Sequence, residues 1–203
     1  MQPINIMDGD LVVAADGGSR HLLSLGILPG VLIGDLDSSD PALVEKWRAA
    51  GVEIIQHPEE KDQTDLELAI MEAQNRGAQK IVVYGAIGGR LDMTFGNLFL
   101  LAYPKLTTPT TFINGQEEVH MLHPGSLLTI VGEADDMVSL IPIQPGDSSV
   151  STTGLQYPLK NELLEFGMTR GISNRLTGKR GTIHLDRGLL AVIHTRNAPQ
   201  EEI

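Results

Sequence analysis

The stretch Gly30–Ser38 reads Gly-Val-Leu-Ile-Gly-Asp-Leu-Asp-Ser, an apolar run that ends in two carboxylates. The run is typical of a strand, whereas Gly, Asp and Ser are common in the turns that follow strands. Asp35 and Asp37 are two residues apart, so in an extended segment their side chains leave on the same face and can serve one divalent ion. Taken alone, the stretch favours a plain surface turn, and only its neighbours reverse that interpretation.

The first half of the chain repeats this arrangement of apolar run and turn. Four short apolar runs precede Gly, Asp or Pro, at Leu11–Ala15, Gly30–Ile33, Val52–Ile55 and Lys80–Tyr84. Helical patterns lie between or after them, at Pro41–Ala50 behind the N-cap Asp40, behind the capping box Thr64–Glu67, and at Leu91–Tyr103, which is apolar enough for a buried helix. Strands that alternate with helices predict a mostly parallel α/β sheet, with ligands beyond the carboxyl ends of its strands.

Six aspartates of this half lie in short acidic strings: Asp16, Asp35, Asp37, Asp62, Asp65 and Asp92. Carboxylates that converge at the ends of neighbouring strands repel one another unless a cation neutralises them. Hard oxygen ligands suit Mg²⁺, which shares its remaining positions with water and substrate phosphates. The pattern therefore predicts a Mg²⁺-nucleotide enzyme, although Asp65 is explained equally well by the start of a helix.

Two glycine-rich strings suit phosphate. After Asp16, Gly17 lets the backbone approach a phosphate closely, and the amides of the next helix attract anions. In the second string, Arg90 can present a planar fork to phosphate oxygens, while Asp92 fixes that fork or binds the metal. The alternatives are a tight strand-to-helix turn at Gly17 and an exposed ion pair at Arg90.

Beyond Pro104–Pro109 the pattern changes to short strands separated by Gly, Pro and Asp turns. The strand candidates are Thr110–Asn114, Glu117–Leu122, Ser126–Val131, Met137–Ile141, Thr182–Leu185 and Leu189–His194, the last two forming a hairpin around residues 186–188. No helix is expected here, apart from a turn near Asn161–Glu165. The fold class is therefore an α/β domain, residues 1–106, followed by an all-β sandwich or barrel, residues 107–203.

Composition narrows the possible partners. A formal charge of −11 argues against nucleic acid, whose phosphates need Lys and Arg. The absence of Cys excludes disulfides, thiolate nucleophiles and Cys-ligated zinc. No apolar run approaches a membrane span, and the start of the chain lacks the form of a signal peptide, so no membrane partner and a cytoplasmic location are expected.

The acidic strings occur in a specific order: Ala-Asp-Gly-Gly (15–18), Gly-Asp-Leu-Asp-Ser (34–38), Lys-Asp-Gln-Thr-Asp-Leu-Glu (61–67) and Gly-Gly-Arg-Leu-Asp (88–92). Together with Thr153–Leu159 and Gly171–Asn174, they resemble the thiamine pyrophosphokinase family from about Leu11 to His194. The resemblance implies an ATP- and Mg²⁺-binding catalytic domain at 1–106, and a β-sandwich at 107–203 for thiamine binding and dimerisation. It further implies a homodimer with sites at the subunit interface.

The resemblance also implies a reaction and residue roles. The reaction moves the pyrophosphoryl group of ATP to the hydroxyl of thiamine, giving thiamine diphosphate and AMP. The metal would lie on Asp16, Asp35, Asp37 and Asp65, and catalysis would rest on Asp35, Asp37, Asp65 and Arg90. ATP would be bound by Asp16, Gly17, Lys61, Asp62, Thr64, Arg90 and Asp92, and thiamine by Tyr157, Ser173 and Asn174.

Two departures from the family pattern keep other functions open. Only Met1–Asp10 precede Leu11, so the family's first strand and its Gly-rich turn are missing or altered. Met93 stands where bacterial members commonly carry a His, and Met makes no strong hydrogen bond. The alternatives are a pyrophosphokinase for another alcohol, such as a hydroxymethylpterin, and a non-catalytic protein that binds thiamine or nucleotide.

Overall fold

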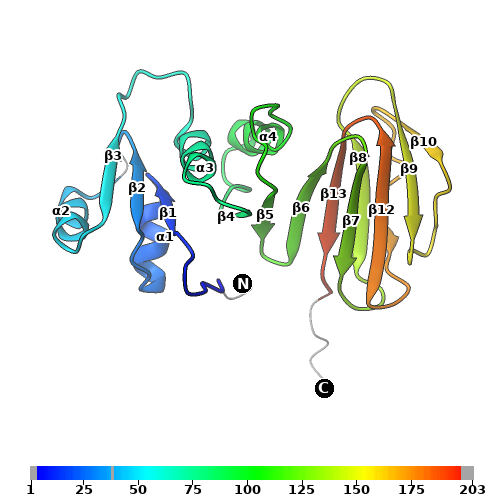
Figure 1. Cartoon of the computed structure of the whole chain (residues 1–203), viewed down its shortest axis with the longest axis horizontal. Coiled ribbons are helices and arrows are strands. Elements are labelled where there is room, and N and C mark those ends of the chain that lie inside the picture. The colour runs from blue at the N-terminus through cyan, green and yellow to red at the C-terminus, as the bar shows by residue number, and fades with distance from the viewer. Residues whose placement is uncertain (1–3, 38, 198–203) are drawn as a thin grey trace. The chain divides into compact units, whose positions relative to one another are not determined.

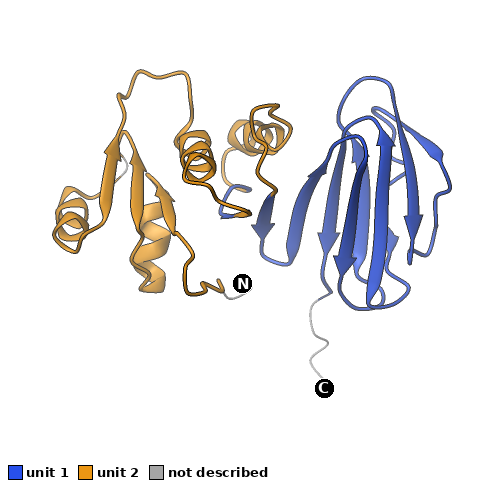
Figure 2. Cartoon of the chain, viewed as in Figure 1, with its two compact units in different colours: residues 1–2, 82–87, 110–203 blue, residues 3–81, 88–109 orange. Residues whose placement is uncertain are grey.

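The computed structural model describes residues 4–37 and 39–197 of the chain (Figure 1). These residues form two compact units, which Figure 2 distinguishes by colour. Unit 2 contains residues 4–81 and 88–109, and unit 1 contains residues 82–87 and 110–197. Within the described residues, no helix has the length and apolar character needed to cross a membrane.

Unit 2 is built on a parallel sheet, as predicted. Strands β1 (Val13–Ala15), β2 (Val31–Gly34) and β3 (Glu53–Gln56) pair in parallel in the order β1-β2-β3. All four residues of β2 are buried. A central parallel strand is covered on both faces, which explains why its sequence is a continuous apolar run instead of an alternating one.

Helices cover both faces of this sheet (Figure 1). Leu22 of α1 (Gly18–Leu25) and Trp47 of α2 (Pro41–Ala49) share one apolar cluster with the β2 residue Leu32. On the other face, Ala69 of α3 (Asp65–Asn75) packs with Ile33, the residue after Leu32. Successive side chains of a strand point to opposite faces, so β2 supplies both layers.

Local capping chemistry fixes two of the helix starts as predicted. The Asp40 carboxylate accepts a hydrogen bond from the Ala42 N–H at 2.9 Å, and Thr64 Oγ1 accepts one from the Glu67 N–H at 3.2 Å. Helix α4 (Leu91–Leu100) ends before Tyr103. The expectation that it is buried was wrong, because Leu91, Phe95 and Phe99 are all more than half exposed.

Unit 1 is a sandwich of two sheets. One has the strand order β11-β8-β13-β6-β5-β4, and the other has the order β10-β9-β12-β7. Their strands are β4 (Ile81–Tyr84), β5 (Thr110–Asn114), β6 (Glu117–Leu122), β7 (Ser126–Val131), β8 (Met137–Pro142), β9 (Asp147–Thr153), β10 (Glu162–Glu165), β11 (Asn174–Arg175), β12 (Arg180–Arg187) and β13 (Leu190–Thr195). Apolar side chains of both sheets, such as Val192 and Ile183, form one core cluster. The described residues after 105 contain no α-helix.

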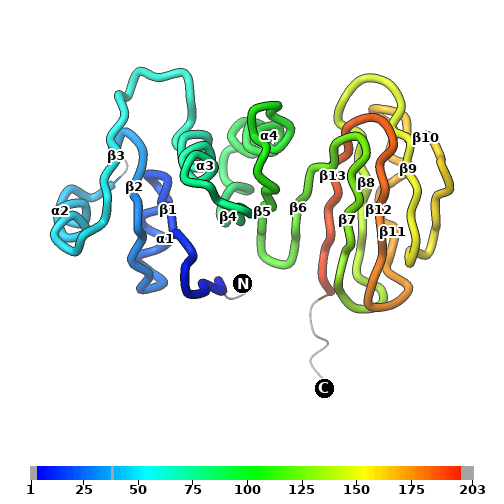
Figure 3. The backbone as a smooth tube through the Cα atoms, in the orientation of Figure 1, coloured from blue at the N-terminus to red at the C-terminus, as the bar shows by residue number. Residues whose placement is uncertain are grey.

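Three local expectations were wrong. Strand β4 joins the sheet of unit 1 instead of the parallel sheet, and its alternating buried and exposed residues suit an edge strand with one covered face. Residues 182–194 do not form a hairpin, because β12 pairs with β7 and β9, whereas β13 pairs with β6 and β8. The connecting turn therefore carries the chain from one sheet to the other (Figure 3). Residues 162–165 are the strand β10, not an isolated turn.

Candidate active site

Three predicted carboxylates lie together in unit 2. Asp16 directly follows β1, Asp35 directly follows β2, and Asp65 is the first residue of α3. Each contributes an oxygen to a group whose members all lie within 4.8 Å of one another. The carboxyl ends of parallel strands meet at one edge of a sheet, which is why residues distant in sequence converge here.

Gly34 allows the three carboxylates to come this close. A Cβ atom at this position would lie 2.8 Å from Asp16 Cβ and 3.1 Å from both Cγ and Oδ1 of Asp65. Its φ of +148° also lies in a region that residues with a side chain rarely adopt. The glycine is therefore required both by its backbone conformation and by the space around it.

Lys61 supplies the positive charge nearest to this acidic group. Its Nζ donates a hydrogen bond to Asp35 Oδ2 at 2.8 Å and lies 3.1 Å from Asp65 Oδ1 in an ion pair. The Lys61 side chain is only 11% exposed, so the ammonium is held in place instead of moving freely in solvent. Sequence reasoning expected Lys61 to contact ATP and did not foresee its contact with the carboxylates.

The electrostatic environments of these groups differ. The hydrogen bond from Lys61, followed by the N–H of Asp37, lowers the pKa of Asp35. Burial raises the pKa of Asp65, and Lys61 opposes that rise only in part. The hydrogen bond to Asp35 raises the pKa of Lys61, which keeps its ammonium protonated. Lys61 thus stabilises the charged form of Asp35, whereas the charged form of Asp65 is destabilised by burial.

The donor set fits a hard divalent cation. It consists of carboxylate oxygens alone, from three different segments, and hard oxygen ligands of this type are the ones that Mg²⁺ prefers beside water and phosphate. Among the described residues, no donor reaches the buried Asp65 Oδ1 in hydrogen-bond geometry, although the Lys61 ammonium lies 3.1 Å away as an ion-pair partner. A buried carboxylate oxygen without a donor is costly, and a cation would compensate it.

Asp37 does not join this group, and the local geometry differs from the extended segment that was expected. Leu36 has a φ of +68°, which turns the chain between Asp35 and Asp37. The N–H of Asp37 donates to Asp35 Oδ1 at 3.2 Å, an arrangement typical of a turn stabilised by an aspartate side chain. Asp37 is exposed, and its role as a ligand stays a prediction.

The residues expected to bind nucleotide lie in unit 2. Gly17 is the N-cap of α1, while Thr64 caps α3 and Asp62 is exposed two residues before it. Arg90, the N-cap of α4, makes a two-pronged ion pair with Asp92, with Nη2–Oδ2 at 2.6 Å and Nε–Oδ1 at 3.1 Å. Both side chains are well exposed, which leaves the guanidinium accessible to a phosphate.

The residues expected to bind thiamine lie in unit 1, where two of them are joined. The N–H of Tyr157 donates to Asn174 Oδ1 at 3.0 Å, and Asn174 Nδ2 donates to the Tyr157 carbonyl at 2.8 Å. Asn174 is buried and holds the Tyr157 backbone, while the Tyr157 side chain is 63% exposed. Ser173 is exposed at a φ of +64°, and its N–H donates to Ser139 Oγ.

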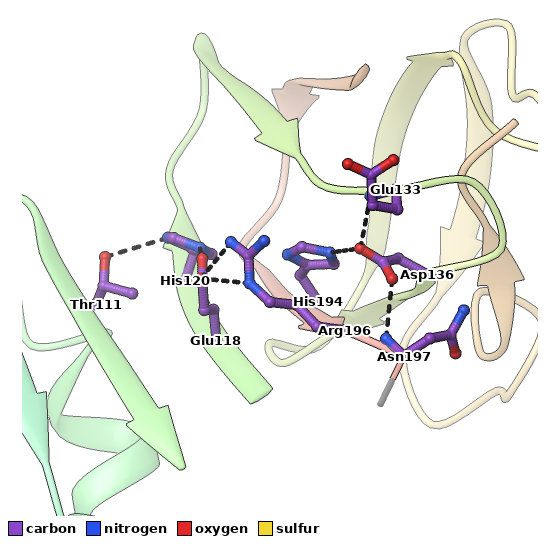
Figure 4. A network of polar contacts seen from close by, with 8 residues as sticks. All are labelled: Thr111, Glu118, His120, Glu133, Asp136, His194, Arg196 and Asn197. Carbon is purple, nitrogen blue, oxygen red and sulfur yellow. Dashed lines mark hydrogen bonds and ion pairs between the residues drawn. The ribbon is translucent and has the colours of Figure 1, made fainter. Parts of the chain in front are cut away.

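Sequence reasoning missed a buried polar network in unit 1 (Figure 4). His194 is fully buried, and its Nε2 lies 3.1 Å from Asp136 Oδ2. Burial would raise the pKa of Asp136, but the N–H groups of Asn197 and Glu133, and then His194, lower it. No sequence signal pointed to this pair, because its members are 58 positions apart.

Comparison with known families supplies two matches. The model "Thiamin pyrophosphokinase, catalytic domain" matches residues 6–113. The model "Thiamin pyrophosphokinase, vitamin B1 binding domain" matches residues 128–190. The two matches follow one another along the chain, and the first alone covers more than half of it.

Individual relatives agree with the family models. A thiamine pyrophosphokinase of Bacillus subtilis is 33% identical over 186 residues, covering 91% of this chain and 87% of the relative. Thiamine pyrophosphokinase 1 of Oryza sativa is 28% identical, covering 92% of this chain and 80% of the relative. A crystal structure of the Bacillus subtilis protein superposes with a TM-score of 0.84 at 30% identity, covering 95% of this chain and 91% of that chain. A crystal structure of a thiamin pyrophosphokinase from Geobacillus thermodenitrificans superposes with a TM-score of 0.82 at 30% identity. The match covers 98% of this chain and 91% of that chain.

Proposed function

The chain belongs to the thiamine pyrophosphokinase family, and from that premise we propose how its residues act in the reaction. The enzyme is a thiamine diphosphokinase that makes thiamine diphosphate and AMP from thiamine and ATP. In this reaction the thiamine hydroxyl oxygen bonds to the β-phosphorus of ATP, and the bond from that phosphorus to the bridging oxygen of AMP breaks. The hydroxyl proton is lost to a base or to solvent.

We propose that Asp16, Asp35 and Asp65 hold Mg²⁺, with Asp37 as a further ligand. The observation that carries this proposal is the group of three carboxylate oxygens within 4.8 Å of one another. When bound, the ion neutralises charge on the polyphosphate, which is the main requirement of phosphoryl-type transfer. The protein's own part is to hold together two carboxylates at strand ends and one at the start of α3, which Gly34 permits sterically.

The nucleotide is assigned to the loops around this group. Lys61 would exchange one of its carboxylate partners for a phosphate oxygen, and Arg90 would exchange Asp92 for the phosphate charge that develops on the leaving AMP. Asp62, Thr64 and Asp92 would orient the polyphosphate or the metal's water ligands. The main-chain amides at Gly17, where α1 begins, would receive an anion.

Thiamine is assigned to unit 1. Tyr157 offers an exposed aromatic face to a cationic, aromatic substrate, and Asn174 fixes the backbone from which that face projects. Ser173, the residue before Asn174, offers an exposed hydroxyl. The match of residues 128–190 to a vitamin B1-binding family model supports this assignment over the hydroxymethylpterin alternative.

A homodimer with sites at the subunit interface is part of this proposal, as is a cytoplasmic location. The exposed apolar residues Leu91, Phe95 and Phe99 follow one another at a spacing of four along α4, so they lie on one helix face and suit burial against another surface. Sedimentation analysis would give the mass of a dimer. A monomer at all concentrations would contradict this part of the proposal.

The reaction is tested by its product. Purified protein incubated with ATP should release AMP only when both thiamine and Mg²⁺ are present. Release of ADP, or AMP release that is independent of thiamine, would rule the reaction out. Hydroxymethylpterin in place of thiamine should give no AMP above the background without an alcohol.

The metal assignment is tested by two substitutions in neighbouring positions. Asp35→Asn should reduce turnover by at least about 100-fold, the upper end of the effect of losing a residue that only orients a ligand, because a ligand itself is neutralised. Asp37→Asn should also remove turnover if Asp37 becomes a ligand, while the fold stays intact. Turnover of Asp37→Asn at the level of the unmodified enzyme would remove Asp37 from the metal site and leave the other three carboxylates.

A further inference from the structure

Two buried serines connect Asp16 to the rest of unit 2. Ser39 Oγ donates a hydrogen bond to Asp16 Oδ1 at 2.9 Å, and Ser19 Oγ lies 3.2 Å from Ser39 Oγ. Ser19 is fully buried and Ser39 is 6% exposed. Because the single hydroxyl proton of Ser39 goes to the carboxylate, Ser19 must be the donor in the contact between the two hydroxyls.

This chain of hydroxyls joins three separate segments. Asp16 follows β1, Ser19 lies in the first turn of α1, and Ser39 lies between β2 and α2. The main chain of Asp16 is held as well, since its N–H donates to the Ile33 carbonyl at 2.9 Å and its carbonyl accepts from the Ser19 N–H at 2.9 Å. The main chain of Asp16 is therefore fixed, and the hydrogen bond from Ser39 restricts the rotation of its carboxylate.

Neither serine is explained by the roles assigned so far. Asp16 itself is 4% exposed, so bulk solvent is a poor replacement for the lost hydroxyl. A carboxylate free to rotate would not keep its oxygen within the group formed with Asp35 and Asp65. The loss of a partner of this kind, which orients a metal ligand from behind, typically lowers metal affinity or activity about 10- to 100-fold.

We infer that Ser39, supported by Ser19, is a positioning residue that orients the Asp16 carboxylate for the divalent cation. This inference rests on the proposed metal site. Ser39 touches neither substrate nor metal in this role and acts only through Asp16. A purely structural pair of hydroxyls would affect the stability of unit 2 and leave the metal affinity unchanged.

The test is Mn²⁺ binding by the full chain, followed through the electron paramagnetic resonance signal of the free ion. Ser39→Ala should weaken Mn²⁺ binding about 10- to 100-fold, the usual effect of losing a partner that orients a ligand. Ser19→Ala should weaken it less, because Ser39 can still donate to Asp16. Ser148→Ala is the matched control, since Ser148 Oγ is also buried but has no hydrogen-bond partner among the described residues, and it should leave Mn²⁺ affinity unchanged.

A double substitution tests whether the effect passes through Asp16. In the Asp16→Asn background, Ser39→Ala should cause little further loss of Mn²⁺ affinity. The inference is overturned if Ser39→Ala binds Mn²⁺ within twofold of the unmodified enzyme, or weakens it by the same factor with and without Asp16. If Ser39→Ala does not fold, unchanged Mn²⁺ binding by Ser19→Ala overturns the inference.

The same titration separates this inference from the proposal on which it rests. Asp35→Asn must weaken Mn²⁺ binding if the acidic group is the metal site. Failure of Asp35→Asn to do so, or no binding by the unmodified enzyme, would overturn the metal site and the role of Ser39 together. Normal binding that is lost in Asp35→Asn but kept in Ser39→Ala would overturn the role of Ser39 alone.

Discussion

Gly34 is the residue on which the geometry of the acidic group most depends. Gly34→Ala should destabilise unit 2 by about 3 kcal/mol, because the methyl group meets Asp16 and Asp65 and the φ of +148° becomes strained. It should also weaken Mn²⁺ binding.

Urea unfolding measures the change in stability, and Gly96→Ala is the control. Gly96 lies within α4 with open space around it, so alanine at this position should stabilise the protein by up to about 1 kcal/mol. Equal effects of the two substitutions would contradict this view of Gly34.

Lys61 should act on metal and nucleotide in opposite directions. Without nucleotide, its ammonium competes with the cation for Asp35 and Asp65, so Lys61→Met should tighten Mn²⁺ binding roughly tenfold. The same substitution should reduce turnover at least tenfold, because it removes the contact with phosphate that we propose for Lys61. Titration with Mn²⁺ and the AMP assay measure the two effects. Lys46→Met, on the exposed part of α2, should change neither, and a loss of Mn²⁺ affinity in Lys61→Met would contradict the competition.

At this scale the sequence predicts some residues of the site and not others. Asp16, Asp35 and Asp65 could be predicted to converge, since strand ends and a helix cap place them; their role as ligands stays a prediction. The turn at Leu36 could not be predicted, because its left-handed conformation is not typical of leucine. Ser39 was missed because its partner Asp16 lies 23 positions away and no periodic pattern marks a buried hydroxyl.

Among the elements, the pairing of β6 with β13 carries the clearest pH dependence. His120, whose Nε2 lies 3.6 Å from Glu118 Oε2, and Arg196, whose guanidinium donates to Oε1 at 2.7 and 3.2 Å, lower the pKa of Glu118 to about 2 (Figure 4). A distance of 3.6 Å is too long for a hydrogen bond, so Arg196 has the better geometry of the two. Glu118 is thus stabilised as an anion in the folded state.

The sign of the effect follows from the lowered pKa. Above the unfolded-state pKa near 4.5 the stabilisation is complete, and it is lost as the pH falls towards about 2. The change is on the order of 3 kcal/mol at most. Urea unfolding of unit 1 between pH 7 and pH 2.5 should show this loss, and Glu118→Gln should be less stable at pH 7 and should lose less on acidification. A parallel loss in both proteins would contradict the assignment to Glu118.

The boundaries of strands could be predicted where turns and apolar runs alternate. The pairing of those strands within the sheets could not be predicted. The sequence predicts strands at 110–114, 117–122 and 126–131 with the bounds observed. It gives no indication that β12 and β13 lie in different sheets, because the turn at 186–188 looks like that of a hairpin. The choice between a hairpin and two separate sheets depends on packing, because β12 and β13 both bury apolar side chains in the common core from opposite sheets.

For the whole molecule, the division into two units allows the effect of metal on the stability of unit 2 to be measured separately from the stability of unit 1. Trp47 is the only tryptophan of the chain and is buried in unit 2, so its fluorescence follows the unfolding of that unit. Mg²⁺ at 100 times its dissociation constant should stabilise unit 2 by about 2.7 kcal/mol. The Trp47 melting midpoint should therefore rise by several degrees with Mg²⁺ and fall back with EDTA. Asp35→Asn should abolish the shift, and a shift that persists in this variant would place the ion elsewhere.

The class of each half could be predicted because hydrophobic periodicity differs between them, whereas the bounds of the two domains stay a prediction. The predicted boundary between residues 106 and 107 assumes that each domain is a continuous segment, whereas residues 82–87 belong with 110–197. The sequence of β4, Ile-Val-Val-Tyr, does not alternate in polarity, so the alternating burial of its residues becomes visible only in the structure. The assignment of ATP to the first part and thiamine to the second stays a prediction.

The position of β13 has a consequence for the order in which unit 1 can fold during synthesis. Strand β13 is the last strand of the described chain, yet it pairs with β6 on one side and with β8 on the other. Until residues 190–195 have been translated, both of those strands present unpaired edges, which are templates for association with other chains. A nascent chain paused before residue 190 should therefore be prone to aggregation.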